Sequence, residues 1–148
     1  MLAKTHQRGW AAALAVTGAA ALLVACQSMS PMTGEQQVTL SGASEVPPVT
    51  TAAAGTGTVT IKEDRSVSAR ITVTGMAATA SHIHEGAAGG NGPVIVPFVK
   101  TGDNTFAAPD GAKLTEAQYA SYKAGNLYVN VHSAKNPGGE VRAQLKAN

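Results

Sequence analysis

Three histidines with the spacing of β-strand side chains are the residues of this chain best suited to metal chemistry. His82 and His84 lie two positions apart in the run S-H-I-H-E-G, and His132 closes the run L-Y-V-N-V-H. Side chains two residues apart on a strand point to the same face, about 6.6 Å from each other, so both imidazoles can reach one ion at about 2.0–2.1 Å. The alternative is three unrelated histidines on solvated strand faces, because H-x-H is a short pattern.

The type of ligand indicates which metal such a site would hold. Imidazole nitrogen is a ligand for both copper and zinc, and copper(II) binds more tightly than its divalent neighbours when the geometry is equal. We therefore predict a transition-metal site at His82, His84 and His132, with copper as the expected ion and zinc as the alternative. Tyr128 and Asn130 alternate with apolar residues so that they share the strand face of His132, and we expect them to orient an imidazole.

Three features beside the H-x-H run have a weaker relation to this site. Glu85 points to the face opposite His84 in a regular strand, so it is not expected to be a ligand. Met76 precedes the run and is interpreted as a core residue rather than as a soft axial ligand. Residues 86–93 contain four glycines, which predicts either a loop wrapped closely beside the site or a flexible turn.

The first 25 residues have the pattern of a bacterial export signal. A basic start, which contains the fourth histidine, His6, precedes an apolar run that is short for a transmembrane helix. The run ends in L-V-A-C at residues 23–26, which resembles the lipobox of bacterial lipoproteins. That resemblance implies cleavage before Cys26 and attachment of lipid to it, which would supply the acyl chains that stable anchoring requires. The alternative is an ordinary secretory signal with a free Cys26.

The residues around Cys26 indicate where such a lipoprotein would reside. Gln27 stands where aspartate is associated with retention in the inner membrane, so we expect an outer-membrane lipoprotein that faces the periplasm, ahead of an inner-membrane or secreted protein. Residues 26–36 are predicted to be the lipidated cysteine and a flexible tether, because they are polar and lack periodicity. Cys26 is the only cysteine of the sequence, so no disulfide can form within it.

The charge balance excludes one class of partner. Removal of the signal takes Lys4 and Arg8 from the 11 basic residues and none of the 9 acidic residues, which leaves equal numbers of each. No basic block or basic face with interspersed aromatic residues remains, so nucleic acid is not an expected partner. The expected partners are the membrane, through the lipid at Cys26, and a metal-trafficking or other envelope protein.

Alternating apolar and polar residues predict a β-domain over residues 37–148. In residues 67–73 every second residue is apolar, and the preceding E-D-R-S is typical of a hairpin turn. Similar runs occur at residues 37–41, 55–62, 81–85, 94–99, 126–132 and 141–145. A capping box at Thr115 predicts one short helix to about Lys123, and residues 101–113 are expected to be a loop. The predicted fold is all-β, an antiparallel Greek-key-like sandwich or flattened barrel of about seven or eight strands with one short helix.

One pair of charged residues near the end of the chain is interpreted as structural. Glu140 and Arg142 lie two residues apart on the polar face of the last predicted strand. We expect them to pair at the surface, with each other or with neighbours. An exposed ion pair of this kind contributes about 0–1 kcal/mol to stability.

Four sequence runs indicate a family. L-S-G-A-S-E-V-P-P-V starts at residue 40, S-H-I-H-E-G at residue 81, A-G-N-L-Y-V-N-V-H at residue 124 and N-P-G-G-E-V-R-A-Q-L at residue 136. Through these runs the chain resembles the CHRD domain, the module named after chordin and also found alone in bacterial exported proteins. The resemblance implies an all-β fold but no settled biochemical activity. Ala143 departs from it, because the family usually has glycine before the final glutamine.

A looser resemblance concerns the Greek-key sandwich of copper/zinc superoxide dismutase. In that family an H-x-H strand and a later V-H strand contribute copper ligands, and His82, His84 and His132 match those positions. The sequence lacks the fourth copper histidine, the bridging histidine, the zinc cluster and the disulfide. The resemblance therefore implies copper binding and gives little support to dismutase activity.

Together these patterns predict an exported, lipid-anchored CHRD-domain protein that binds copper for metal handling in the periplasm. The alternative is a metal-free structural or protein-interaction module of the cell envelope. An enzyme is not expected, because the sequence shows no Ser-His-Asp order, paired-carboxylate spacing or phosphate-binding glycine loop followed by a helix. A redox activity like that of a dismutase is not the favoured function.

Overall fold

The computed structural model describes residues 34–147. The strands are β1 (Glu35–Ser41), β2 (Ala54–Ile61), β3 (Val67–Thr74), β4 (Ala78–Glu85), β5 (Val94–Pro97), β6 (Val99–Gly102), β7 (Thr105–Ala107), β8 (Leu127–Ser133) and β9 (Val141–Leu145), and the helices are the 3-10 turn η1 (Gly42–Ser44) and α1 (Glu116–Lys123). The predicted signal, Cys26 and the tether up to residue 33 lie outside the described residues. No helix of residues 34–147 is long and apolar enough to cross a membrane.

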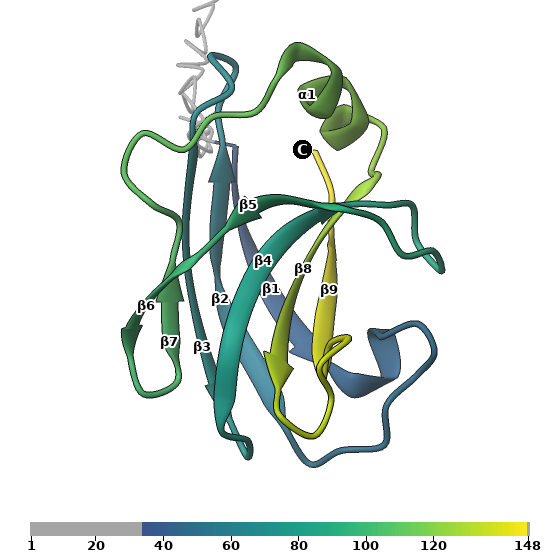
Figure 1. Cartoon of the computed structure of the whole chain (residues 1–148). Helices are drawn as coiled ribbons and strands as arrows, with labels where there is room; N and C mark the ends of the chain where they lie inside the picture. Colours follow the sequence, from purple (N-terminus) through teal and green to yellow (C-terminus); the bar gives the residue numbers. More distant parts are fainter. Residues whose placement is uncertain (1–33, 148) are drawn as a thin grey trace, which may run out of the picture. The chain divides into compact units, whose positions relative to one another are not determined.

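The nine strands form one antiparallel sheet with the order β5-β4-β8-β9-β1-β2-β3-β7-β6. Its two end strands, β5 and β6, are separated in the chain only by Phe98, whose N–H donates to the Ser81 carbonyl of β4 at 3.0 Å. One continuous stretch of chain therefore spans the gap between β4 and β7, and the sheet is nearly closed (Figure 1). The predicted all-β sandwich or flattened barrel is confirmed, with nine strands in place of seven or eight.

The predicted loop over residues 101–113 is partly wrong. It contains the end of β6 and all of β7, and these strands pair in the register Lys100↔Phe106. β6 is exposed along its whole length and β7 has three residues, so neither gives an apolar periodicity that a sequence pattern reveals. Pro97 ends β5, as expected of a residue that cannot donate to a ladder. β1 begins at Glu35, inside the predicted tether.

The core consists of every second residue of the strands and is enclosed by the sheet. On β3, Val67, Ile71 and Val73 are buried, while the polar residues between them face solvent. On β4, Ile83 is fully buried in the core, so the two histidines that flank it face away, as the alternation predicts. The outer face of β4 is therefore the face available for a site.

Helix α1 begins and ends where the sequence predicts. The Thr115 hydroxyl accepts from the Gln118 N–H at 3.2 Å, and the Gln118 side-chain oxygen accepts from the Thr115 N–H at 2.9 Å, which completes the capping box. Gly125 follows the helix with a φ of +75°, the left-handed conformation that commonly ends a helix. Tyr122 is buried against the core, so α1 packs on one end of the sheet.

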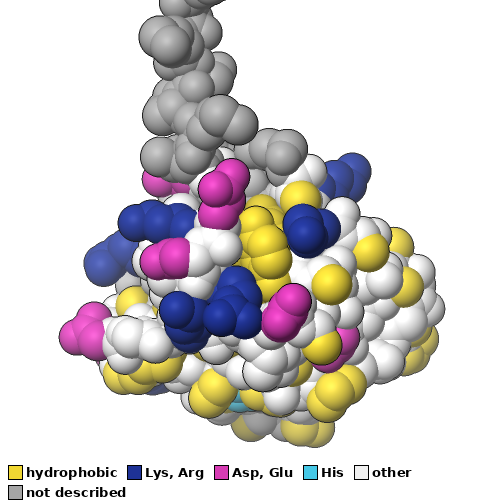
Figure 2. Space-filling view, turned by 90° about the horizontal axis from the view of Figure 1, so that it is seen from above, with side chains coloured by type: hydrophobic (Ala, Val, Ile, Leu, Met, Phe, Trp, Pro, Cys, Tyr) yellow, Lys and Arg dark blue, Asp and Glu magenta, His cyan; other side chains and the backbone are white. Residues whose placement is uncertain are grey.

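The end of the domain that carries α1 is rich in charged side chains. Figure 2 views this end and shows basic and acidic side chains gathered around a group of apolar side chains. A hollow with a volume of about 590 Å³ lies between the β2–β3 turn and α1, and its charged lining residues are Glu63, Asp64, Arg65, Lys113, Glu116 and Lys123. None of the three predicted metal ligands is among them, so this hollow is separate from the predicted site.

Candidate metal centre

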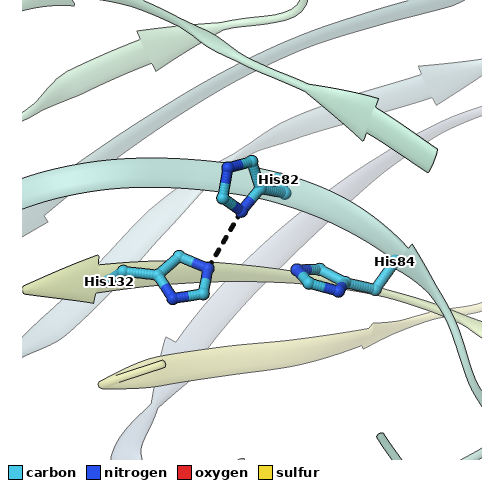
Figure 3. A group of neighbouring side chains, drawn as sticks. All are labelled: His82, His84 and His132. Carbon is cyan, nitrogen blue, oxygen red and sulfur yellow. Dashed lines mark hydrogen bonds between the residues drawn. The ribbon is translucent and has the colours of Figure 1, made fainter. Parts of the chain in front are cut away.

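The pairing of β4 with β8 brings the three predicted ligands together on one face of the sheet. His82 and His84 lie opposite Asn130 and Tyr128, and His132 lies one step further along β8 on the same face. One ring nitrogen from each histidine lies within 4.8 Å of the other two. Figure 3 shows the three rings directed toward a common space. Sequence patterns far apart in the chain therefore converge on one cluster.

A backbone carbonyl fixes which nitrogen of His84 faces the cluster. His84 Nδ1 lies 3.0 Å from the Gly92 carbonyl oxygen. A carbonyl only accepts hydrogen bonds, so Nδ1 carries the proton and Nε2 keeps its lone pair. Nε2 is buried and has no hydrogen-bond partner among the described residues. A buried polar atom without a partner is costly, and a metal ion at the cluster would satisfy it.

His132 is oriented in the same way from the other side. Its Nδ1 lies 2.9 Å from the Pro137 carbonyl oxygen, so its Nε2 also keeps a lone pair. This Nε2 lies 3.0 Å from His82 Nδ1 (Figure 3), which donates to it. When an ion binds, His82 would carry its proton on Nε2 and present Nδ1. The cluster then offers three neutral nitrogen ligands, a set that fits copper or zinc.

Burial keeps the imidazoles of His82 and His132 neutral near pH 7. Desolvation, followed by the nearby His132 and His84, lowers the pKa of His82 to about 4. Burial also lowers the pKa of His132, against the opposing effect of its bond to Pro137. Metal ions bind the unprotonated ring, so these ligands have no proton to lose at neutral pH.

Tyr128 and Asn130, the two residues expected to orient an imidazole, take different positions. The Tyr128 ring stacks on His84 with centroids 4.8 Å apart and planes 7° apart, and its hydroxyl accepts from the Gly92 N–H at 3.2 Å. Asn130 is buried and its side chain faces the Glu45 carboxyl. Its Oδ1 has no partner among the described residues. Tyr128 thus supports both His84 and the carbonyl that orients it.

The glycine-rich loop of residues 86–92 is wrapped closely beside the site. A Cβ atom on Gly92 would lie 1.6 Å from the Glu85 carbonyl oxygen, and one on Gly86 would lie 3.0 Å from the Tyr128 ring. Only glycine fits at residue 92 without a shift of the backbone. Of the two interpretations of this loop, the closely packed one is correct.

The prediction that Glu140 and Arg142 form an exposed pair is wrong. Their side chains are only 5% and 1% exposed, and each belongs to a separate network. The Glu140 carboxylate accepts from the Thr51 hydroxyl at 2.6 Å and from the Ser133 hydroxyl. Arg142 donates to the glycine-rich loop, with a distance of 2.8 Å to the Gly90 carbonyl oxygen. The polar face of β9 is covered by loops, which the alternating pattern of the strand does not reveal.

Met76 and Glu85 lie outside the cluster, as expected. Met76 packs against the core. Glu85 accepts a hydrogen bond from the Ser121 hydroxyl at 2.6 Å, which ties the end of β4 to α1. Among residues 34–147, no carboxylate joins the three histidines as a ligand.

Comparison with known proteins agrees with this description at the level of the family. The sequence model of the CHRD domain matches residues 36–145, a range that includes all three histidines and nearly every strand. Searches of curated proteins and of solved structures found no match.

Proposed function

The chain belongs to the CHRD domain family, and we propose that it binds a copper ion through His82, His84 and His132. One observation carries this proposal: His84 Nε2 is buried without a partner, inside a cluster where ligand nitrogens of all three rings lie within 4.8 Å. A purely structural buried histidine would be expected to bond through both nitrogens. The second nitrogen of His84 instead faces the other two imidazoles.

The donor set supports copper ahead of zinc. All three ligands are neutral nitrogens, and neither a thiolate nor a carboxylate completes the group within residues 34–147. Copper binds such nitrogen sites more tightly than zinc when the geometry is equal. Three ligands also leave room for a further one, from water or from another molecule. Zinc remains the alternative ion.

We further propose that the domain acts at the cell envelope. The L-V-A-C run at residues 23–26 supports lipid attachment at Cys26 and a location at the outer membrane, facing the periplasm. Residues 27–34 separate Cys26 from β1, and at roughly 3.5 Å per extended residue they would hold the domain near the membrane. In this position the protein would bind copper and exchange it with a metal-trafficking or other envelope protein, as a binding protein rather than an enzyme.

A metal-free module is the second candidate function. It is favoured by the bond between His82 Nδ1 and His132 Nε2, because this contact satisfies both atoms without an ion. In that case the cluster would help to hold β4 on β8, and an envelope protein would be the partner. His84 Nε2 would then need a buried water molecule as its partner.

Calorimetric titration distinguishes the two functions. The soluble form that starts at Ser28 is titrated with copper(II) and zinc(II), beside His132→Ala and an outer-face control, Ser68→Ala, on β3. Copper binding is expected at one ion per chain with a dissociation constant below about 1 μM, weakened at least 100-fold in His132→Ala and unchanged in Ser68→Ala. Absence of binding, or equal binding by His132→Ala, would leave the metal-free module.

A further inference from the structure

A buried cation lies one aromatic ring away from the candidate metal centre. Arg142 of β9 is 1% exposed, and its Cζ atom is 3.4 Å from the centroid of the Tyr128 ring. The same ring stacks on His84. Because β8 lies between β4 and β9 in the sheet, the Tyr128 ring separates the guanidinium from the imidazole.

The same guanidinium holds the loop that orients His84. Its Nη2 donates to the Gly90 and Ala87 carbonyl oxygens at 2.8 and 3.4 Å, and its Nη1 donates to Asn91 Oδ1 at 3.2 Å. The residue after Asn91 is Gly92, whose carbonyl accepts from His84 Nδ1. Arg142 therefore fixes the backbone immediately before the atom that sets the tautomer of His84.

The charge of Arg142 is only partly compensated. Its four hydrogen bonds all go to uncharged oxygen atoms, the fourth being that of the Gln144 side chain at 3.2 Å. The acid that faces it is Glu45, whose pKa burial raises to about 7 even though Arg142 opposes the shift. A large fraction of Glu45 is thus protonated at neutral pH, and positive charge remains beside the site.

A buried positive charge discriminates between ions of different charge. Repulsion between two charges in a protein interior is weakly screened, and it is larger for a divalent ion than for a monovalent one. The three neutral imidazoles add no negative charge that would offset this difference. Groups around the ligands, their polarity and their charge are known to set the affinity and redox preference of a metal.

We propose that Arg142 is a positioning residue that holds His84 as a ligand and biases the three-histidine site toward copper(I) over copper(II). This inference rests on the proposed copper site. It assigns two separable effects to one side chain: the hydrogen bonds to the loop raise the affinity for either ion, and the charge changes the ratio of the two affinities.

Two substitutions of Arg142 separate these effects. Arg142→Lys keeps the charge but loses the planar fork, so affinity for both ions should fall about 10- to 100-fold with their ratio unchanged. Arg142→Gln removes the charge, so the ratio of copper(I) affinity to copper(II) affinity should fall about tenfold. Affinities are measured on the full chain in detergent, by competition with bicinchoninate for copper(I) and with glycine for copper(II).

Two milder variants keep the test decisive if substitutions at Arg142 prevent folding. Asn91→Ala, at an exposed residue, removes one hydrogen bond between Arg142 and the loop. It should lower the affinities for copper(I) and copper(II) by the same factor. Glu45→Gln removes the carboxylate that partly compensates the charge of Arg142, so it should raise the ratio of copper(I) affinity to copper(II) affinity. Equal ratios in the wild type, Arg142→Gln and Glu45→Gln would overturn the effect of charge, and full affinity in Asn91→Ala and Arg142→Lys would overturn the positioning role. Absence of copper binding by the wild type would instead contradict the proposed site itself.

Discussion

On the outer face of β3, Ser68, Arg70 and Thr72 are exposed to solvent, whereas every residue of β8 is buried, including the polar Asn130 and His132. Both strands alternate apolar and polar residues in the same way. The difference arises because loops cover the outer face of β8 and β9 and leave that of β3 open. Polar residues under such a cover need partners, so the same alternation gives a solvated surface in one region and a site in the other.

The covered face is held together by two networks that serve the two oriented histidines. Arg142 binds the loop whose Gly92 carbonyl orients His84. The Glu140 carboxylate accepts a hydrogen bond from the Ser133 hydroxyl, and the Ser133 hydroxyl oxygen accepts one from the Asn136 N–H. Asn136 lies in the same turn as Pro137, whose carbonyl oxygen is the partner of His132 Nδ1. Within residues 34–147, the open face of β3 has no comparable network, so substitutions on the two faces should differ sharply.

The largest difference is expected in metal binding. His84→Ala removes the ligand whose Nε2 lacks another partner, and it should weaken copper(I) binding at least 100-fold. Ser68→Ala on the open face should leave the affinity unchanged. Competition with bicinchoninate measures both variants, and equal affinities would remove His84 from the site.

The next difference is expected in stability at the two outer-face arginines. Arg142→Ala removes a buried side chain together with its four hydrogen bonds and should lower the free energy of unfolding by about 3 kcal/mol. Arg70→Ala on the open face should change it by less than about 0.5 kcal/mol. Urea denaturation of the metal-free proteins checks this contrast, which fails if both variants unfold at the same urea concentration as the wild type.

A smaller difference is expected between glycines of the two loops beside the site. Gly92→Ala places a methyl group against the Glu85 carbonyl, so it should cost about 2 kcal/mol and weaken copper binding by displacing the partner of His84. Gly138→Ala meets nothing within 4 Å and should leave both quantities nearly unchanged. Thermal unfolding and the copper competition assay together test the pair, and a destabilised Gly138→Ala would contradict the assigned packing.

The smallest expected effect is a pH dependence from Glu45. Burial raises its pKa from 4.5 to about 7, so the folded protein retains a proton that the unfolded chain releases between these values. The stability from this group is full below pH 4.5 and is lost as the pH rises through 7. The full shift corresponds to about 3 kcal/mol. Solvent screening reduces this value, so relative to Glu45→Gln the wild type should lose on the order of 1–2 kcal/mol from pH 4.5 to pH 8.

A matched control isolates that effect from other titrating groups. His82 has the opposite sign, because its lowered pKa removes stability as the pH falls from 6.5 through about 4. Both proteins contain His82, so its contribution cancels in the difference between the wild type and Glu45→Gln. A pH-independent difference between the wild type and Glu45→Gln would show that the pKa of the Glu45 carboxyl is not raised in the folded protein.

Much of the site follows from local patterns, and the remainder depends on contacts between distant segments. The alternation in S-H-I-H and L-Y-V-N-V-H places His82, His84 and His132 on outer faces, because strand geometry is local. Their convergence requires the β4–β8 register. The carbonyl partners of the rings, at Gly92 and Pro137, belong to the backbone and have no signature in residue type beyond the glycine and proline turns around them.

The burial of Glu140 and Arg142 was not predictable for a related reason. A strand that reads V-R-A-Q-L has the same alternation whether its polar face meets solvent or a loop. Only the path of residues 42–53 and 86–92 over β8 and β9 decides the outcome, and that path depends on long-range packing. The hairpin of β6 and β7 was missed because its strands are short and exposed.

Imidazole nitrogen NMR of the metal-free and copper(I)-loaded protein tests the central claim most directly. In the metal-free protein at pH 7, His84 and His132 should each carry one proton, on Nδ1, and an unprotonated Nε2. One equivalent of copper(I) should shift Nε2 of both residues together with Nδ1 of His82, and no other imidazole nitrogen should become a ligand. Protonation of His84 at Nε2 in the metal-free protein, or ring nitrogens that are unchanged by copper(I), would contradict the account.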